Sequence, residues 1–259
     1  MSQTSRREAL KAQQLAQAKA ARRMRMIGLG AAVAAVLLAV LLIVALVNGG
    51  STASASYPKN ANEAKNGVLL ATVAPKPDAP KIEVYIDFQC PLCRAAEERY
   101  GQTLVDLARA GDVVVTQRTV TFMDGNLSNT ASARAALAAT CADNAGKYAE
   151  MTAAIFAQQE AKEVVGSIGY SDAMLRNTLP AQVGIAGADL TTYQQCYDTK
   201  APKPLLDAVS KASYNSGVRG TPTFVRNGAQ LPIQPVDDTK NKIPATTVDQ
   251  FKSLILTGK

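Results

Sequence analysis

The feature that most constrains this chain is a run of 21 consecutive uncharged residues at positions 27–47. The run consists mostly of Ala, Val, Leu and Ile, and as a helix it would cross roughly 30 Å of hydrocarbon. A signal peptide has a shorter apolar core of about 7 to 15 residues, so an uncleaved anchor is favoured over a cleaved leader. We therefore expect residues 27–47 to be a single transmembrane helix in contact with the lipid bilayer.

Basic side chains are concentrated before this run. Residues 1–26 carry seven Lys and Arg against one acid, which accounts for six of the seven units of net charge. The positive-inside rule then places residues 1–26 in the cytoplasm and the chain after the span outside. The remaining chain is nearly balanced in charge. The positive excess is therefore a membrane-topology signal of residues 1–26, and we expect no nucleic-acid partner.

The part after the span is predicted to hold a linker and one domain. Residues 48–66 are rich in Gly, Ser, Ala and Asn and lack apolar periodicity, which is typical of a flexible tether. Residues 67–259 are long enough to form a single domain with its own core. The expected protein is thus a single-pass membrane protein with an extracytoplasmic domain.

The hydrophobic pattern of this domain predicts an α/β fold. Strands are expected at 67–73, 81–88 and 112–122, with a helix over 91–110 between the second and the third. The next stretch, about 124–217, is predicted to be mostly helical, including an alanine-rich helical segment over 127–159. Strand character returns at 221–228, and a helix over 247–255 begins with the capping-box pair Thr247 and Gln250. The order indicates a sheet domain with a helical insertion.

Two cysteines lie at the start of the helix predicted over 91–110, in "DFQCPLC". Cys90 would be the N-cap, where free backbone N–H groups and the helix dipole favour a thiolate, and Pro91 suits the first helical position. Cys93 lies one turn later on the same side, within reach of a disulfide. We expect Cys90 to be the exposed attacking sulfur and Cys93 the more buried resolving one.

Two other interpretations of this pair stay open from spacing alone. A CxxC on the oxidising side of a membrane can be an inert structural bridge. A zinc site would need Cys141 and Cys196 as further ligands, and it is disfavoured because the chain has neither a second CxxC nor any histidine. We therefore expect no metal and no cofactor.

Together, "DFQCPLC", the helical insertion and "GTPTFVRNG" resemble the DsbA-like thioredoxin-fold proteins, especially the membrane-anchored ones of Gram-positive bacteria. The resemblance covers about residues 67–259 and implies a thioredoxin fold. In that family the Thr–Pro peptide bond is cis and faces the dithiol, which implies that Thr221 and Pro222 bind substrate. A plain turn is the alternative for these two residues.

The chain departs from the family pattern at two positions. Leu92 stands where the best-known oxidising members have histidine, so a cation beside the thiolate is missing. Val84 stands where thioredoxins and many DsbA proteins bury an acid. Glu83 and Asp87 are near, but strand alternation points both away from the face of Val84. Each is either a proton relay or a carboxylate that is solvated or lies at the sheet edge.

The remaining cysteines, Cys141 and Cys196, lie in helices of the predicted insertion. If Cys90 pairs with Cys93, they are left as partners for each other. A bridge closing that loop would stabilise the domain by about 4 kcal/mol in the chain-entropy model. Similar membrane-anchored relatives carry such a second bridge, so the resemblance implies a structural disulfide.

Three functions are compatible with these features. The first is an enzyme that introduces disulfides into unfolded secreted proteins, the second a disulfide reductase or isomerase, and the third a non-catalytic anchored binding module. The first requires an electron acceptor in the membrane, and the resemblance implies a reoxidant of the vitamin K epoxide reductase-like or DsbB-like type.

Overall fold

The structure, a computed structural model, describes residues 57–259. The expected cytoplasmic tail, the transmembrane helix and half of the linker lie outside the described residues. Within residues 57–259, no helix combines the length and the apolar character that crossing a membrane requires.

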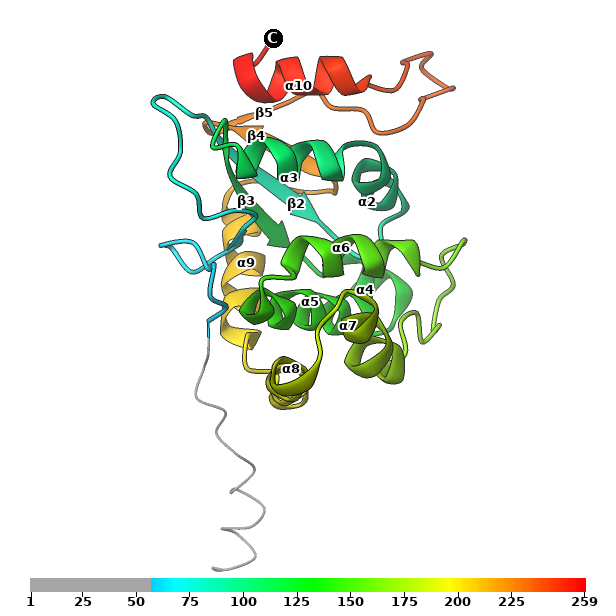
Figure 1. The fold of residues 1–259 in the computed structure, drawn as a ribbon. Helices are drawn as coiled ribbons and strands as arrows, with labels where there is room; N and C mark the ends of the chain where they lie inside the picture. The colour runs from blue at the N-terminus through cyan, green and yellow to red at the C-terminus, as the bar shows by residue number, and fades with distance from the viewer. Residues whose placement is uncertain (1–56) are drawn as a thin grey trace, which may run out of the picture. The chain divides into compact units, whose positions relative to one another are not determined.

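A mixed sheet forms the centre of the described domain (Figure 1). Its strands stand in the order β1-β3-β2-β4-β5, with β2 and β3 parallel and all other neighbours antiparallel. The register places Val84 of β2 beside Gln117 of β3 and Phe224 of β4, so these three share one face. The strand bounds are β1 Val68–Leu69, β2 Lys81–Ile86, β3 Val114–Thr119, β4 Thr223–Arg226 and β5 Ala229–Gln230.

The connection between β2 and β3 is helical, because parallel neighbours need a crossover. It comprises α2 (Pro91–Ala96), a π-helical turn η1 (Glu97–Gly101) and α3 (Gln102–Arg109) without a break. The helix expected over 91–110 is therefore confirmed, with a widened turn in its middle that the hydrophobic spacing did not predict.

The last helix, α10 (Val248–Thr257), packs on the same face of the sheet as η1. Phe251 stacks on Tyr100 with 4.3 Å between ring centroids and meets Phe224 edge-on at 5.7 Å. The capping box expected at Thr247 and Gln250 is present. This aromatic cluster joins the C-terminal helix to the centre of the sheet.

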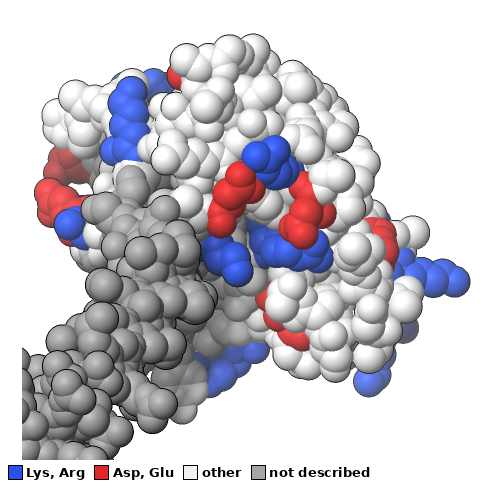
Figure 2. Space-filling view, turned by 90° about the horizontal axis from the view of Figure 1, so that it is seen from below, with Lys and Arg blue, Asp and Glu red and all other residues white. Residues whose placement is uncertain are grey.

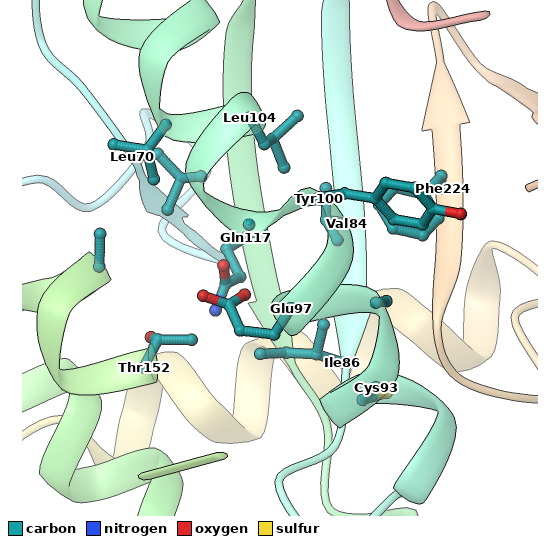
Figure 3. Close-up of a pocket in the computed structure, with 14 residues that line it drawn as sticks. Leu70, Val84, Ile86, Cys93, Glu97, Tyr100, Leu104, Gln117, Thr152 and Phe224 are labelled. Carbon is teal, nitrogen blue, oxygen red and sulfur yellow. The ribbon is translucent and has the colours of Figure 1, made fainter. Parts of the chain in front are cut away.

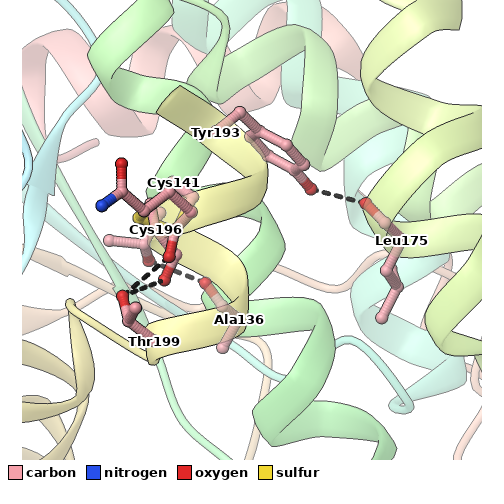
Figure 4. Close-up of a disulfide and its surroundings, with 8 residues drawn as sticks. Ala136, Cys141, Leu175, Tyr193, Cys196 and Thr199 are labelled. Atoms are coloured by element: carbon pink, nitrogen blue, oxygen red, sulfur yellow. Dashed lines mark hydrogen bonds between the residues drawn. A yellow bond between two sulfur atoms is a disulfide. The ribbon is translucent and has the colours of Figure 1, made fainter. Parts of the chain in front are cut away.

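The segment between β3 and β4 is a helical insertion, as expected. In it α5 is central: nearly all of its residues are buried, and it contacts α6, α8 and α9 (Figure 1). A disulfide between Cys141 and Cys196, with the two Cα atoms 5.8 Å apart, joins α5 to α8 (Figure 4). The elements of the insertion are α4 (Phe122–Leu127), α5 (Ala131–Ala142), η2 (Asp143–Ala145), α6 (Tyr148–Ala157), η3 (Met174–Thr178), α7 (Leu179–Gln182), α8 (Gly187–Thr199) and α9 (Lys203–Asn215).

Two expectations were wrong in extent. The strand expected over 67–73 is only the two-residue β1, since its pairing with β3 ends at Leu69. The alanine-rich segment 127–159 is broken into separate helices rather than continuous. Ser128 and Gly146 adopt left-handed backbone angles, with φ of 53° and 68°, and each ends a helical stretch there.

The outer surface of the insertion carries opposite charges side by side around a hollow (Figure 2). Ion pairs on this surface are largely exposed, so each contributes little to stability. Their charges balance one another across the hollow. The pairs are Arg134–Asp172, Arg176–Asp198 and Lys203–Asp207.

Candidate active site

Cys90 is the N-cap of α2, as expected, with extended backbone angles and Pro91 at the first helical position. Cys90 and Cys93 are both unbonded, so the structure shows the dithiol form. Cys93 is 1% exposed and Cys90 8%. The order of burial is as expected, but the expectation that Cys90 is exposed was wrong.

The loop before β4 lies against Cys90 and accounts for part of its burial. The carbonyl oxygen of Thr221 is 3.2 Å from Cys90 Sγ, and the neutral thiol can donate to it. The Thr221–Pro222 peptide bond is cis. The structure thus brings the expected pair Thr221 and Pro222 to the dithiol, and it leaves Cys141 and Cys196 within the helical insertion.

The two sulfurs have opposite acidities. The pKa of Cys90 is lowered to about 6, chiefly because the Cys93 thiol hydrogen-bonds to Cys90 Sγ. Smaller contributions come from the Thr221 side chain and the N–H groups of Cys93 and Leu92. Burial opposes this shift. At Cys93, burial raises the pKa well above its usual value. At neutral pH the pair therefore holds a thiolate at Cys90 and a thiol at Cys93.

Leu92 is 41% exposed beside this thiolate and offers it no charge. The nearest basic residue along the helix, Arg94, donates to the Gln159 carbonyl at 3.4 Å and pairs with Glu98 at 3.7 Å. The acidity of Cys90 consequently rests on hydrogen bonds from neutral groups, as the absence of histidine between the cysteines predicts.

The helical insertion holds the backbone that leads into Cys90. The carbonyl of Phe88 accepts hydrogen bonds from Tyr170 Oη at 2.6 Å and Gln159 Nε2 at 2.7 Å. Gln159 Nε2 also lies 3.1 Å from the Cys90 carbonyl. The insertion therefore holds the backbone at Phe88 and Cys90 in place relative to the sheet.

Asp87 is fully buried, which excludes the alternative that it is a solvated carboxylate. Its Oδ1 accepts from Gln89 N at 2.9 Å and Ser132 Oγ at 2.5 Å, and its Oδ2 accepts from Met123 N at 2.9 Å. Burial raises the pKa of this carboxyl. With its oxygens engaged in this way, Asp87 ties the strand end to the first two helices of the insertion.

Glu83 points away from Val84, as strand alternation predicts. It lies 3.0 Å from Arg118 and accepts from Tyr85 Oη at 2.7 Å. Neither carboxylate considered from the sequence therefore occupies the face on which Val84 lies.

A carboxyl that the sequence reasoning missed does occupy that face. Glu97 lines a cavity together with Val84 and Cys93 (Figure 3). Burial raises the pKa of Glu97 to about 7. The signal for it was present in the spacing, since Glu97 follows Cys93 by one helical turn.

Within residues 57–259, no group of three or more His, Cys, Asp or Glu side chains is arranged to hold a metal ion. The described site consists of two sulfurs, the backbone and side chain of Thr221, and the partly buried Glu97 carboxyl behind Cys93. Such an arrangement can exchange a disulfide by thiolate attack without a further group.

Solved structures with this fold come from several bacteria, at identities that establish the fold alone. MdbA, a thiol-disulfide oxidoreductase from Corynebacterium diphtheriae, matches with 22% identity and a TM-score of 0.56, over 71% of this chain and 92% of that chain. BdbD from Bacillus subtilis matches with 18% identity and a TM-score of 0.55, over 78% and 95%. DsbA from Mycobacterium tuberculosis matches with 21% identity and a TM-score of 0.51, over 75% and 100%.

A comparison with curated proteins found no match. The sequence does match a family model, described as Thioredoxin, over residues 71–254. That range includes the dithiol, the whole helical insertion and the loop of Thr221 and Pro222. Since the match spans well over half of the chain, the protein belongs to the thioredoxin family.

Proposed function

We propose that this chain is a thiol-disulfide oxidoreductase that introduces disulfides into secreted or surface proteins through Cys90 and Cys93. The observation that carries the proposal is the pair itself: the sulfur of the N-cap residue Cys90, with a pKa of about 6, lies next to the buried Cys93 thiol and the loop of Thr221. The structurally similar MdbA is a thiol-disulfide oxidoreductase, which supports the same chemistry here.

The reaction starts from the Cys90–Cys93 disulfide. A substrate thiolate attacks Cys90 Sγ, a mixed disulfide forms, and Cys93 leaves as a thiolate that takes up a proton. A second substrate thiolate then attacks the substrate sulfur of the mixed disulfide, and Cys90 leaves as a thiolate. Two electrons pass from the substrate to the protein. The low pKa of Cys90 makes it a good leaving group in this last step.

Thr221 and Pro222 are proposed to bind the substrate. The Thr221 carbonyl lies 3.2 Å from Cys90 Sγ, so a chain held along this loop has its own sulfur close to the attacking one. An extended peptide can pair with exposed backbone next to a sheet edge, which requires no particular side chains. This mode of binding suits substrates that are still unfolded.

The cellular setting is also proposed. Residues 27–47 would anchor the protein in the cell membrane, with residues 1–26 in the cytoplasm and residues 67–259 outside on the 48–66 tether. Newly translocated chains emerge at that surface. Reoxidation of the dithiol would then come from a membrane protein of the vitamin K epoxide reductase-like or DsbB-like type.

Two alternatives differ from this proposal in direction or in chemistry. A reductase or isomerase of the same fold is favoured by Leu92, because no cation beside Cys90 adds to the oxidising power. A non-catalytic binding module is disfavoured by the acidic Cys90 and the loop placed against it.

Oxidised full-length protein mixed with a reduced, unfolded test protein checks the proposal. We expect one disulfide formed per molecule of protein, and Cys90→Ala should abolish the transfer. The reduction potential of the Cys90–Cys93 couple decides the direction: a value as low as that of thioredoxin, about −270 mV, would indicate the reductase.

A further inference from the structure

Behind Cys93, on the sheet side of its helix, lies a cavity of about 20 Å³. Its walls come from α2 and η1, from β2 and β3, and from α6. Figure 3 shows the Glu97 side chain in this cavity, with its carboxyl directed toward Gln117 and Thr152. Cys93 lines the same cavity, so the Glu97 side chain and the resolving cysteine border one small space that is partly open to solvent.

Helix geometry places the carboxyl there. Cys93, Glu97 and Gly101 follow one another at intervals of four residues and lie along one face of the helical segment. Gly101 closes the π-helical turn, and a Cβ atom on it would lie only 2.6 Å from Glu97 Cδ. Because glycine has no Cβ, position 101 leaves the space that the Glu97 carboxyl occupies.

Two other polar groups of the cavity wall lack hydrogen-bond partners among the described residues. They are Gln117 Nε2 and Thr152 Oγ1, which both are buried. Leaving a buried polar atom unpaired costs about 1 to 3 kcal/mol. A cavity above about 10–15 Å³ with two to four polar partners is what a bound water requires. The cavity of Glu97 meets both conditions.

Glu97 makes no ion pair within residues 57–259, and its raised pKa follows from burial alone. Nearby, Arg109 of α3 is engaged by Glu150 of α6 at 3.3 Å. The titratable and charged side chains around Glu97 are Cys93 and Tyr100 in the cavity wall, Tyr148 and Glu150 on α6, and Glu98, Arg99 and Arg109 on its own helical segment.

We propose that Glu97 accepts, through water held in this cavity, the proton that Cys93 must lose to become a nucleophile, an inference that rests on the proposed function. In the step, a mixed disulfide joins Cys90 to a partner thiol. The Cys93 proton passes to the Glu97 carboxylate, the Cys93 thiolate attacks Cys90 Sγ, and the partner leaves as a thiolate. In the reverse direction Glu97 returns the proton to Cys93.

The other acids near the dithiol are unsuited to this role. The Asp87 oxygens are engaged by three donors that hold the insertion, and Glu83 lies on the opposite face of the sheet beside Arg118. Glu97 thus places a carboxyl, carried by the helix, on the face of the sheet where β2 carries the apolar Val84.

The test follows Cys93 directly in the full-length protein. Reduced protein is mixed with excess dithiobis(nitrobenzoate): Cys90 releases one coloured thiol as it forms the mixed disulfide, and Cys93 releases the second when it attacks Cys90. We expect the rate of the second release to rise with a midpoint near pH 7, the pKa of Glu97. In Glu97→Gln this rise should vanish, and the rate above the midpoint should fall by about 100-fold.

Two variants complete the design. Gly101→Ala keeps the acid but displaces its carboxyl from the cavity, so it should slow the second release as Glu97→Gln does. Glu98→Gln removes the exposed neighbouring acid and should change nothing. A normal first release with an unchanged second release in both Glu97→Gln and Gly101→Ala would overturn the role of Glu97 alone. If unsubstituted protein gave no first release, the proposed function itself would fail.

Discussion

At the scale of single residues, Cys90 is made acidic by neutral neighbours. The Cys93 thiol contributes most to the lowered pKa, and the Thr221 side chain contributes less. We expect Cys93→Ala to raise the pKa of Cys90 above about 6, and Thr221→Val to raise it by a smaller amount. The ultraviolet absorbance of the thiolate, followed against pH, measures both values.

Thr223→Val is the matched control for this pair of variants, since the Thr223 hydroxyl donates to the Gly220 carbonyl at 2.8 Å. It should leave the titration of Cys90 unchanged. A Thr221→Val protein that titrates like the unsubstituted one would show that the hydroxyl of Thr221 does not support the thiolate.

Glu97 also has a predicted effect on stability. Its pKa is about 7 in the folded protein against an ordinary value of 4.5, so between these values the folded state binds more protons than the unfolded state. The free energy of unfolding should therefore fall as the pH rises from 4.5 to 7 and then level off. Glu97→Gln should remove this fall.

The measurement is denaturant unfolding of the reduced protein and the variant at a series of pH values. Taking the difference between the two proteins cancels the contribution of Cys90, and Glu98→Gln should follow the unsubstituted protein. Equal slopes for Glu97→Gln and the unsubstituted protein would contradict the raised pKa.

The sequence predicted the position of a residue correctly where the order and spacing of neighbouring residues determine the backbone geometry. The N-cap position of Cys90 follows from a strand, a proline and a helical pattern in succession. The burial of Asp87 could not be predicted from strand alternation, because it arises from Met123 and Ser132 of the insertion, which are distant in sequence. Glu97 was missed because the usual acid was sought on the strand, and only the packed structure shows that the helix reaches the same cavity.

At the scale of elements, most residues of α5 are buried, and many of them are alanines. Ala138 has no exposed surface, whereas Ala133 on the same helix is only half-buried. We expect Ala138→Leu to destabilise the protein by about 1–3 kcal/mol through overpacking. Ala133→Leu, the same change on the outer side, should cost much less. Thermal or denaturant unfolding measures the stability of both variants. Equal losses of stability would contradict the burial of Ala138 inside the packed insertion.

The limits of element prediction have similar physical causes. The helix over 91–110 was recognisable from its apolar spacing, but that spacing carries no signal for the π-helical turn at Glu97–Gly101. Gly146 is a familiar helix terminator, whereas Ser128 adopts its left-handed angles in this fold without a sequence preference that favours them. The division of the alanine-rich segment was therefore only partly visible in advance.

At the scale of the whole molecule, the two cysteine pairs have separate surroundings and should have separate roles. Cys90 and Cys93 lie at the sheet, and the Cys141–Cys196 disulfide lies between α5 and α8 with a sequence separation of 55. Closing a loop of that length stabilises a fold by about 4 kcal/mol in the chain-entropy model. We propose that this second bridge is structural.

The double variant Cys141→Ala/Cys196→Ala tests that assignment. It should lower the free energy of unfolding by about 2–5 kcal/mol and still oxidise a test protein at temperatures where it stays folded, because the dithiol and the loop of Thr221 are untouched. Cys90→Ala/Cys93→Ala should show the reverse, with stability largely kept and transfer lost. In the unsubstituted protein, thiol counting under increasing reductant should free Cys90 and Cys93 first. Loss of transfer in the folded Cys141→Ala/Cys196→Ala protein would assign the second pair to the electron path and refute its purely structural role.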